Sequence, residues 1–580
     1  MSSSAIATLP AEEKQYEETT DVSGQTTRAP STSRGDAEKA VVKEDGPSAA
    51  PAVDDEAAAA ERPAAAAQHD GEYPGGLQLT FIVVALVLGI FLISLDMTIV
   101  ATAIPRITDD FHSINDISWY GSAFFLTLGG FQSTWGKAYK YFPLKTSFLL
   151  AIFVFELGSL ICGVAPNSPT LIVGRAIAGL GAAGTGSGAY TIIGFSVAPQ
   201  KRATFTGIVG ASYGLAAVIG PLIGGAFTDR ITWRWCFYIN LPIGGVAGLI
   251  ILLFFHTPTA AQPLAAPLRE KLLQMDLPGT TLLMGAVISF ILALQYGGQT
   301  HPWASSLPVG LLVGFVLLLA AFTAVEVVQG ERAMLAPRLM RDRNVWVSGV
   351  FACVFAGAYF VVIYYLPLYF QSIDGASPIA SGVRNLPLIL AVTVATVVSG
   401  ASISRTGVAT PLMVVGAVLA TVAAGLLYTL DVGTGSGPWI GYQVLGGLGW
   451  GVAFQVPMII GQGTAAPSDL ASVTAIILFF QTIGGAFLVG AAQSGFVNQL
   501  LHELPALAPG VDPILVVATG ATQLRAAFPA DQLDGVLRAY MAGLKVAFAI
   551  ATGAVGVSVP VSLLSKWKRI HADGGVGGAV

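Results

Sequence analysis

Long apolar runs follow one another from Leu77 almost to the end of the chain, and short polar stretches separate them. A helix needs about twenty mostly apolar residues to cross a membrane, and irregular backbone cannot face lipid. The pattern therefore predicts an all-α membrane protein. We expect fourteen transmembrane helices, at residues 80–102, 118–136, 146–165, 170–195, 205–227, 237–256, 276–295, 307–328, 345–370, 383–402, 409–430, 438–462, 468–496 and 541–565.

The seventh and eighth predicted helices differ from the others. The stretch "PVGLLVGFVLLLAAFTAVEVV" carries no polar side chain that we expect to face a cavity before Glu326, and an evenly apolar helix can face lipid all round. We interpret this pair as a linker inserted between two six-helix bundles. The predicted parts are a disordered acidic cytoplasmic tail (1–75), an N-terminal six-helix bundle (76–256), cytoplasmic loops with two linker helices (257–344), a C-terminal six-helix bundle (345–566) with an external loop (497–540), and a cytoplasmic tail (567–580).

Composition supports the membrane assignment. The chain is 54% hydrophobic and 11% charged, whereas a soluble domain is about 25% charged. Residues 1–75 are different, because they hold fifteen acidic and six basic residues among many Ser, Thr, Pro and Ala. This composition is typical of a disordered segment. Three cysteines are too few for a disulfide scaffold.

Positive charge predicts the orientation in the membrane. With the N-terminus placed in the cytoplasm, fifteen Lys and Arg fall in the cytoplasmic loops and C-terminal tail, against about six on the opposite side. Both termini are therefore expected inside, although twelve spans would give the same orientation. We expect the plasma membrane, with a vacuolar or vesicle membrane as the alternative.

Three ionisable residues lie well inside the predicted spans: Asp96, Glu156 and Arg175. A charge at the centre of a membrane helix costs roughly 2.5–3.5 kcal/mol, and such residues commonly mark ion or proton pathways. We interpret all three as candidates for proton coupling. The alternative is a structural ion pair or an interhelical hydrogen bond. The sequence does not show which acid Arg175 meets.

The stretch "GLAAVIGPLIGG" (214–225) predicts a bent and closely packed helix. Pro221 removes a backbone hydrogen bond, and Gly220, Gly224 and Gly225 permit close contact at the bend. Such a helix suits a hinge or a seal, and the alternative is a kink without further role.

The polar residues of the second half are mostly neutral, which suits a large uncharged or weakly charged ligand held between apolar walls. Hydrogen bonds between helices are the alternative use of these side chains. The candidates for a substrate cavity are Tyr359, Tyr364, Gln371, Gln443, Gln455 and Gln481.

The sequence carries no pattern of soluble catalysis. Its six His residues are scattered without metal-ligand spacing, and its Gly-rich stretches lack the Lys-Ser/Thr of a phosphate-binding loop. We expect no enzyme activity, no metal, no cofactor and no nucleic-acid partner. An ion gradient is then the remaining source of energy.

Five stretches in order resemble the major facilitator superfamily, in particular its fourteen-helix drug:proton antiporter group and fungal toxin or multidrug efflux pumps. They are "LDMTIVATAIP" (95–105), "LIVGRAIAGLGAAG" (171–184), "AAVIGPLIGG" (216–225), "WRWCFYINLPIG" (233–244) and "YYLPLYFQSIDGASPIASGVRNLP" (364–387). The resemblance implies two bundles that rock about a central site, with proton entry exchanged for exit of a small-molecule substrate. It also implies a monomer that works in the lipid bilayer.

Carried over by position, Asp96 would bind the proton, Arg175 would assist its transfer, and the glycines and proline of 220–225 would shape the bend that limits leak. Two other functions stay open. One is import of an iron chelate, as in siderophore carriers, and the other is a membrane sensor that keeps the transporter fold.

One loop departs from the family pattern Gly-X-X-X-Asp-Arg/Lys-X-Gly-Arg/Lys-Arg/Lys. It reads "GKAYKYFPLK" (136–145), in which Gly136 and Lys145 fit, Lys140 replaces the acid and Pro143 replaces the second glycine. We predict a gating loop at Gly136, Lys140 and Lys145 whose charge relay is absent or rebuilt.

Overall fold

The computed structural model describes residues 73–111 and 116–570, and every regular element in these ranges is a helix. The predicted disordered tail therefore lies outside the described residues, except for 73–75, and so do residues 571–580 of the C-terminal tail. The all-α prediction is confirmed for the part of the chain that the structure describes.

A helix occupies each of the fourteen predicted ranges. Twelve segments are long and apolar enough to cross a membrane by length and composition, and α2 and α4 are the two predicted spans outside that set. The long helices are α1 (Gly76–Phe111), α2 (Ile117–Tyr141), α3 (Leu144–Val164), α4 (Ser168–Ser196), α5 (Pro199–Arg230), α7 (Asn240–Phe254), α9 (Leu277–Tyr296), α10 (Ser306–Gln329), α12 (Arg343–Ser372), α14 (Leu386–Thr406), α15 (Thr410–Tyr428), α16 (Ser436–Ala453) with α17 (Val456–Thr464), α18 (Leu470–Leu507) and α21 (Ala530–Leu563). The short helices are α6 (Trp235–Tyr238), α8 (Leu268–Leu273), α11 (Pro337–Met340), α13 (Pro378–Arg384), α19 (Pro513–Ala518) and α20 (Leu524–Ala527).

Local sequence signals set several helix ends. Asn167 precedes α4, and its side chain accepts a hydrogen bond from the backbone N–H of Thr170 at 3.0 Å. Asp276 caps α9 in the same way through the N–H of Gly279, at 2.9 Å. Gly407 ends α14 with φ of 70°, a left-handed conformation that glycine adopts without strain.

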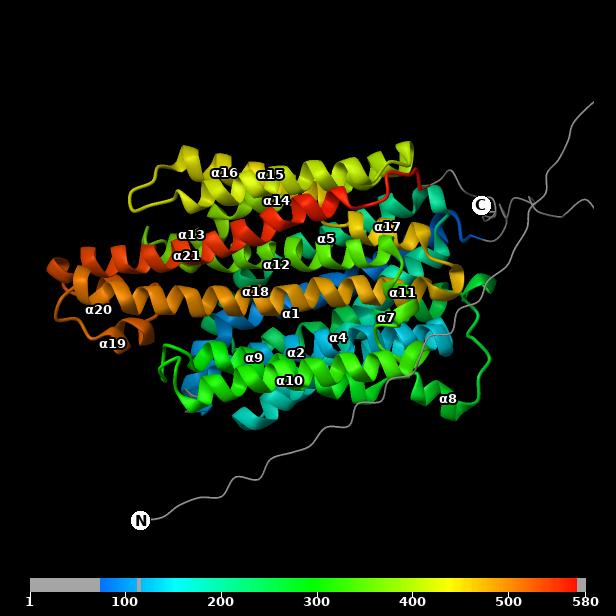
Figure 1. Cartoon of the computed structure of the whole chain (residues 1–580), viewed down its shortest axis with the longest axis horizontal. Coiled ribbons are helices and arrows are strands. Elements are labelled where there is room, and N and C mark those ends of the chain that lie inside the picture. The colour runs from blue at the N-terminus through cyan, green and yellow to red at the C-terminus, as the bar shows by residue number, and fades with distance from the viewer. Residues whose placement is uncertain (1–72, 112–115, 571–580) are drawn as a thin grey trace, which may run out of the picture. The chain divides into compact units, whose positions relative to one another are not determined.

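The packing contacts divide the long helices into two groups. In the first group α4 packs against α2 and α3, and α1 packs against α5 and α7. In the second group α12, α18 and α21 pack together, as do α14, α15 and α16. The groups meet along two seams, α5 with α14 and α2 with α18, and α9 pairs with α10 beside α2 and α18 (Figure 1).

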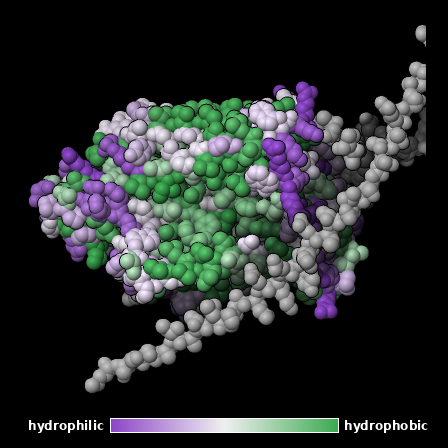
Figure 2. All heavy atoms as spheres, viewed as in Figure 1, coloured by the Kyte–Doolittle hydropathy of each residue, from purple (hydrophilic) through white to green (hydrophobic). Residues whose placement is uncertain are grey.

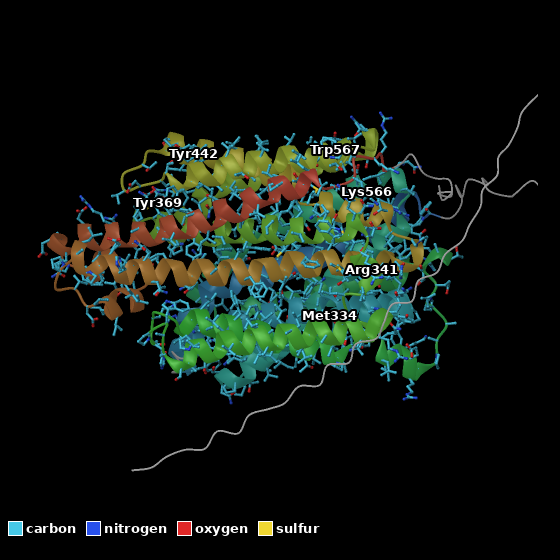
Figure 3. The ribbon with its side chains drawn as sticks, viewed as in Figure 1. Met334, Arg341, Tyr369, Tyr442, Lys566 and Trp567 are labelled. Atoms are coloured by element: carbon cyan, nitrogen blue, oxygen red, sulfur yellow. The ribbon has the colours of Figure 1, made fainter. Side chains whose placement is uncertain are left out.

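The surface agrees with a protein that crosses a bilayer. On the face shown in Figure 2, hydrophobic residues gather over the middle of the helices and hydrophilic residues gather at both ends. Arg341 and Lys566 lie at the end that also holds α11, whereas Tyr369 and Tyr442 lie toward the opposite end (Figure 3). We refer to these as the predicted cytoplasmic end and the predicted external end.

Candidate functional site

Asp96 of α1 and Arg175 of α4 form an ion pair inside the first group of helices. Asp96 is fully buried and Arg175 is 1% exposed. The Nε of Arg175 also donates to the backbone carbonyl of Tyr120 at 2.8 Å, and its guanidinium carbon lies 4.5 Å from the ring centroid of Phe124. Because both side chains are buried, the two charges depend on each other for compensation.

Asn240, the first residue of α7, completes this arrangement. Its Nδ2 donates to Oδ1 of Asp96 at 3.2 Å and lies 3.1 Å from Oγ of Ser159 on α3. One amide thereby joins three helices around the carboxylate. Asn240 was not among the sequence candidates, although it lies in "WRWCFYINLPIG", a stretch that carries the family resemblance.

Glu156 lies on α3, one helical turn before Ser159. Both carboxylate oxygens are buried and have no hydrogen-bond partner among the described residues. The carboxylate occupies the space that Gly244 leaves open, since a Cβ at Gly244 would lie 1.7 Å from Oε1 of Glu156. Glu156 is thus near the Asp96 group but is not hydrogen-bonded to it.

The glycine-rich stretch of α5 packs against α1 beside this pair. A Cβ at Gly220 would lie 2.1 Å from Oγ1 of Thr98, so only glycine allows this approach. Pro221 lies inside α5, and Gly224 is buried. Gly225 has open space around it, with no atom within 4 Å of a Cβ built there. The close contact predicted from the sequence therefore resides at Gly220.

A cavity of about 620 Å³ lies between the two groups of helices, which is within the range of small-molecule sites. Met97 and Phe125 line it, and they directly follow Asp96 and Phe124 in sequence. Asp96 and Arg175 are not among the lining residues, so the ion pair lies one layer behind the wall. None of the described residues that line the cavity is charged.

The polar groups of the cavity are amides and hydroxyls. Two of the predicted residues, Tyr364 and Gln481, line it. Further polar lining residues are Ser122, Gln132, Tyr190, Tyr213, Gln295, Gln299, Thr482 and Gln493. None of these residues was among the predicted cavity residues, because an isolated polar residue in an apolar helix can equally well form a hydrogen bond between helices.

The other four cavity candidates lie elsewhere. Tyr359 is buried against Phe454, with ring centroids 5.3 Å apart. The three glutamines make hydrogen bonds between elements, as Gln371 does with Ser381 (3.4 Å), Gln443 with the carbonyl of Arg384 (2.9 Å) and Gln455 with Tyr190 (3.2 Å). These three glutamines therefore make the hydrogen bonds between helices that the sequence offered as the alternative to a role in the cavity.

The predicted gating loop lies at the predicted cytoplasmic end, where α2 meets α18. Nζ of Lys140 lies 2.8 Å from Oδ1 of Asp469, the residue before α18. Arg338 binds the same carboxylate with both terminal nitrogens, at 2.9 and 3.0 Å. These hydrogen bonds and those to Glu331 hold the pKa of Arg338 above its usual range. One acid thus holds cations from two separate segments.

Backbone packing closes the same end. A Cβ at Gly136 would lie 2.3 Å from the Cβ of Ala475, so α2 and α18 touch there. Across the other seam, Oγ1 of Thr204 donates to Oγ of Ser404 at 2.8 Å. Lys145 does not join the seam, since its Nζ donates to the carbonyl of Leu252 within the first group, at 2.8 Å. These contacts therefore lie between the cavity and the predicted cytoplasmic end.

Among the residues that the structure describes, no group of three His, Cys, Asp or Glu side chains is arranged to hold a metal ion. The three cysteines, Cys162, Cys236 and Cys353, are free.

Many apolar helices, a buried intramembrane ion pair and a ligand-sized cavity between two helix groups define a multi-pass membrane transporter. The sequence model of the Major Facilitator Superfamily matches residues 86–489, and the chain belongs to this family.

Relatives support the same assignment. The chain is 56% identical to the MFS-type transporter grgE of Penicillium sp, over 94% of this chain and 96% of the relative. It is 53% identical to the probable efflux pump gsfJ of Penicillium aethiopicum (87% and 90% covered) and 44% identical to the MFS-type efflux pump MFS1 of Arthroderma benhamiae (85% and 92% covered).

Solved structures agree on the fold. The human organic anion transporter MFSD10 matches with a TM-score of 0.53 at 13% identity, over 84% of this chain and 100% of that chain. The proton:xylose symporter XylE matches with a TM-score of 0.52 at 12% identity, over 85% and 98%. At such identities the likeness concerns the fold alone.

Proposed function

We propose that this protein exports uncharged amphipathic small molecules, such as a fungal secondary metabolite, toxin or drug, in exchange for protons. The observation that carries the proposal is the buried Asp96–Arg175 pair one layer behind a ligand-sized cavity. The cavity is lined by apolar groups, amides and hydroxyls, which suits a neutral ligand. The efflux pumps among its relatives favour export over import.

Coupling would work through the ion pair. A proton on Asp96 removes the charge that compensates Arg175. Among the described contacts, Arg175 then keeps the carbonyl of Tyr120 and aromatic ring faces. Breaking one side of a buried pair costs about 3–5 kcal/mol. The contact of α1 with α4 would therefore rearrange on protonation, and Met97 and Phe125 would carry that change into the cavity wall.

The proton gradient supplies energy on a matching scale. One proton entering down 100 mV supplies about 2.3 kcal/mol before any pH difference is added. This is enough to shift a two-state equilibrium about fiftyfold, so one or two protons suffice for exchange against a modest substrate gradient.

Alternating access would separate the two groups of helices, which we assign to the bundles 76–256 and 345–566. The α2–α18 and α5–α14 seams would open at the predicted cytoplasmic end and close at the other. Lys140 and Gly136 belong to the first seam, so we assign the gating role to them and to Asp469. Lys145 would instead stabilise the first bundle.

The proposal is tested with the purified full chain in proteoliposomes and the neutral dye Nile red. A pH gradient that is acidic on the external face of the protein should drive the dye toward that face while protons move the other way. Collapsing the gradient should stop this movement. Gradient-driven uptake in the reverse direction would point to an importer, and dye binding without gradient-driven movement would point to a sensor. Comparison of metabolites in cells and medium, with and without the gene, then identifies the substrate.

A further inference from the structure

The inserted helix α9 forms part of the cavity wall. Six lining residues belong to α9, among them Met284, Ile291 and Gln295, and Gln299 follows just past its end. The neighbouring helix α10 contributes no lining residue. The interpretation of both helices as a linker is therefore incomplete, because one of them reaches the cavity.

At the predicted cytoplasmic end, α9 is fastened to α2 of the first bundle. The hydroxyl oxygens of Thr134 and Thr280 lie 3.2 Å apart, and Oγ1 of Thr134 also contacts the backbone carbonyl of Met275 at 3.3 Å. Further along, Met284 packs on Gly130, where a Cβ would lie 2.8 Å from its Cγ. This spacing lets α9 lie close to α2 in this half.

At the predicted external end, α9 is fastened to α18 of the second bundle instead. Nδ2 of Asn498 donates to the carbonyl of Gly297 at 3.2 Å, and Nε1 of Trp303 donates to Oδ1 of Asn498 at 3.3 Å. The rings of Phe290 and Phe487 meet edge to face with centroids 4.8 Å apart. The helix is thus held against both bundles, beside the space between them.

We propose that α9 is a specificity-determining wall of the cavity, in which Gln295 and Gln299 bind the oxygen-bearing groups of a neutral amphipathic ligand. The inference rests on the proposed function, since it names the substrate class of the same cavity. An amide offers both a donor and an acceptor without charge, so it recognises carbonyl, ether and hydroxyl oxygens. Gln295 lies in the last turn of α9, and Gln299 lies just past it, where its Nε2 donates to the carbonyl of Leu294 at 3.4 Å and leaves its amide oxygen to accept from a ligand. Gln493 of α18 adds a third amide to the wall.

Equilibrium binding to the full chain in lipid nanodiscs tests this wall directly. Two neutral probes are compared: Nile red, which carries oxygen acceptors, and diphenylhexatriene, a hydrocarbon. Gln295→Leu and Gln299→Leu should each raise the dissociation constant of Nile red about five- to tenfold, the loss expected for one hydrogen bond. For diphenylhexatriene, the dissociation constant of both variants should stay within about twofold of the wild-type value.

Gln499→Leu is the matched control. Gln499 lies on α18 and donates to Glu503 at 2.9 Å, and it does not line the cavity. This variant should keep both constants, and thermal unfolding of all variants shows that the fold is retained. If one of the two glutamine variants does not fold, the other still tests the proposal.

Three results would overturn the proposal: unchanged Nile red binding in both α9 variants, equal losses for both probes, or a wild-type chain that binds neither. A failure of the proposed function looks different. In that case the α9 variants would still discriminate between the probes in nanodiscs, while a pH gradient would move neither probe in proteoliposomes.

Discussion

Lys140 and Asp469 lie 329 positions apart in the chain and form a 2.8 Å ion pair between α2 and the start of α18. The family pattern has an acid where Lys140 stands, so the sequence suggested a lost charge. The structure instead shows a cation on α2 facing an anion at the start of a helix, where the helix dipole also favours negative charge. An ion pair of the opposite polarity therefore stands where the family pattern places its acid.

The first prediction concerns this pair. Lys140→Asp places two carboxylates together, which leaves Arg338 as the remaining cation on Asp469 in the described contacts. Loss of the pair should weaken closure of the predicted cytoplasmic end by about 1–2 kcal/mol, which is a factor of about 5–30 in population. Efflux should slow accordingly, and a cysteine placed at Ala475 should react faster with a water-soluble maleimide.

The charge-swapped double variant Lys140→Asp/Asp469→Lys should recover a large part of the efflux rate. Lys201→Asp, which makes the same charge change on an exposed residue of α5, should have little effect. Normal efflux and normal maleimide reactivity in Lys140→Asp would mean that this ion pair does not hold the gate.

The second prediction concerns the approach of α5 to α1. Gly220→Ala should separate these helices, because its Cβ would lie 2.1 Å from Oγ1 of Thr98, and overpacking of this kind costs about 1–3 kcal/mol. Thermal unfolding in detergent should show the loss, and Thr98→Ala should restore part of it. Gly225→Ala meets open space and should be neutral. Equal losses in both glycine variants would contradict the packing argument.

The third prediction concerns Asn240. Asn240→Leu removes a donor to Asp96 and a contact to Ser159, and a buried polar group left unsatisfied costs about 1–3 kcal/mol. Gradient-driven efflux should fall about tenfold while the protein still reaches the membrane. Ser159→Ala keeps the hydrogen bond from Asn240 to Asp96, so its efflux rate should fall less. An Asn240→Leu variant with full activity would exclude Asn240 from the coupling site.

The fourth prediction concerns pH at the predicted external end. The hydrogen bond from Lys545 at 2.7 Å holds the pKa of Asp431 below its usual range. A lowered pKa contributes stability that is present above the unfolded value of about 3.9 and is lost as pH falls through the folded value. The melting advantage of wild type over Asp431→Asn should therefore shrink below about pH 4. The advantage stays under about 1 kcal/mol because this pair is exposed. A melting advantage that grows as the pH falls would contradict the role given to Asp431.

Hydropathy alone predicted the helices, because lipid requires long apolar segments with an internally bonded backbone. It also identified Asp96 and Arg175 as costly charges. It did not pair them, since the two residues lie 79 positions apart on different helices and helical periodicity carries no information on such contacts.

Other features lay beyond the sequence for related physical reasons. Asp469 lies at the start of a predicted span and gave no sign of its distant partner Lys140. The contribution of α9 to the cavity wall was missed because an apolar helix with one glutamine near its end is also typical of a lipid-facing linker. Gln371, Gln443 and Gln455 had the right chemistry for a cavity, but packing places them in contacts between elements.

The proposed coupling of export to protons through Asp96 is tested most directly by the Asp96→Asn variant in proteoliposomes. Asn keeps the size of the side chain but cannot take up and release a proton. Nile red efflux driven by a pH gradient should fall by at least about a hundredfold, while exchange without a gradient and dye binding are retained. Asp534→Asn, an exposed acid paired with Arg538, is the control and should behave as wild type. Gradient-driven efflux at the wild-type rate in Asp96→Asn would contradict the account.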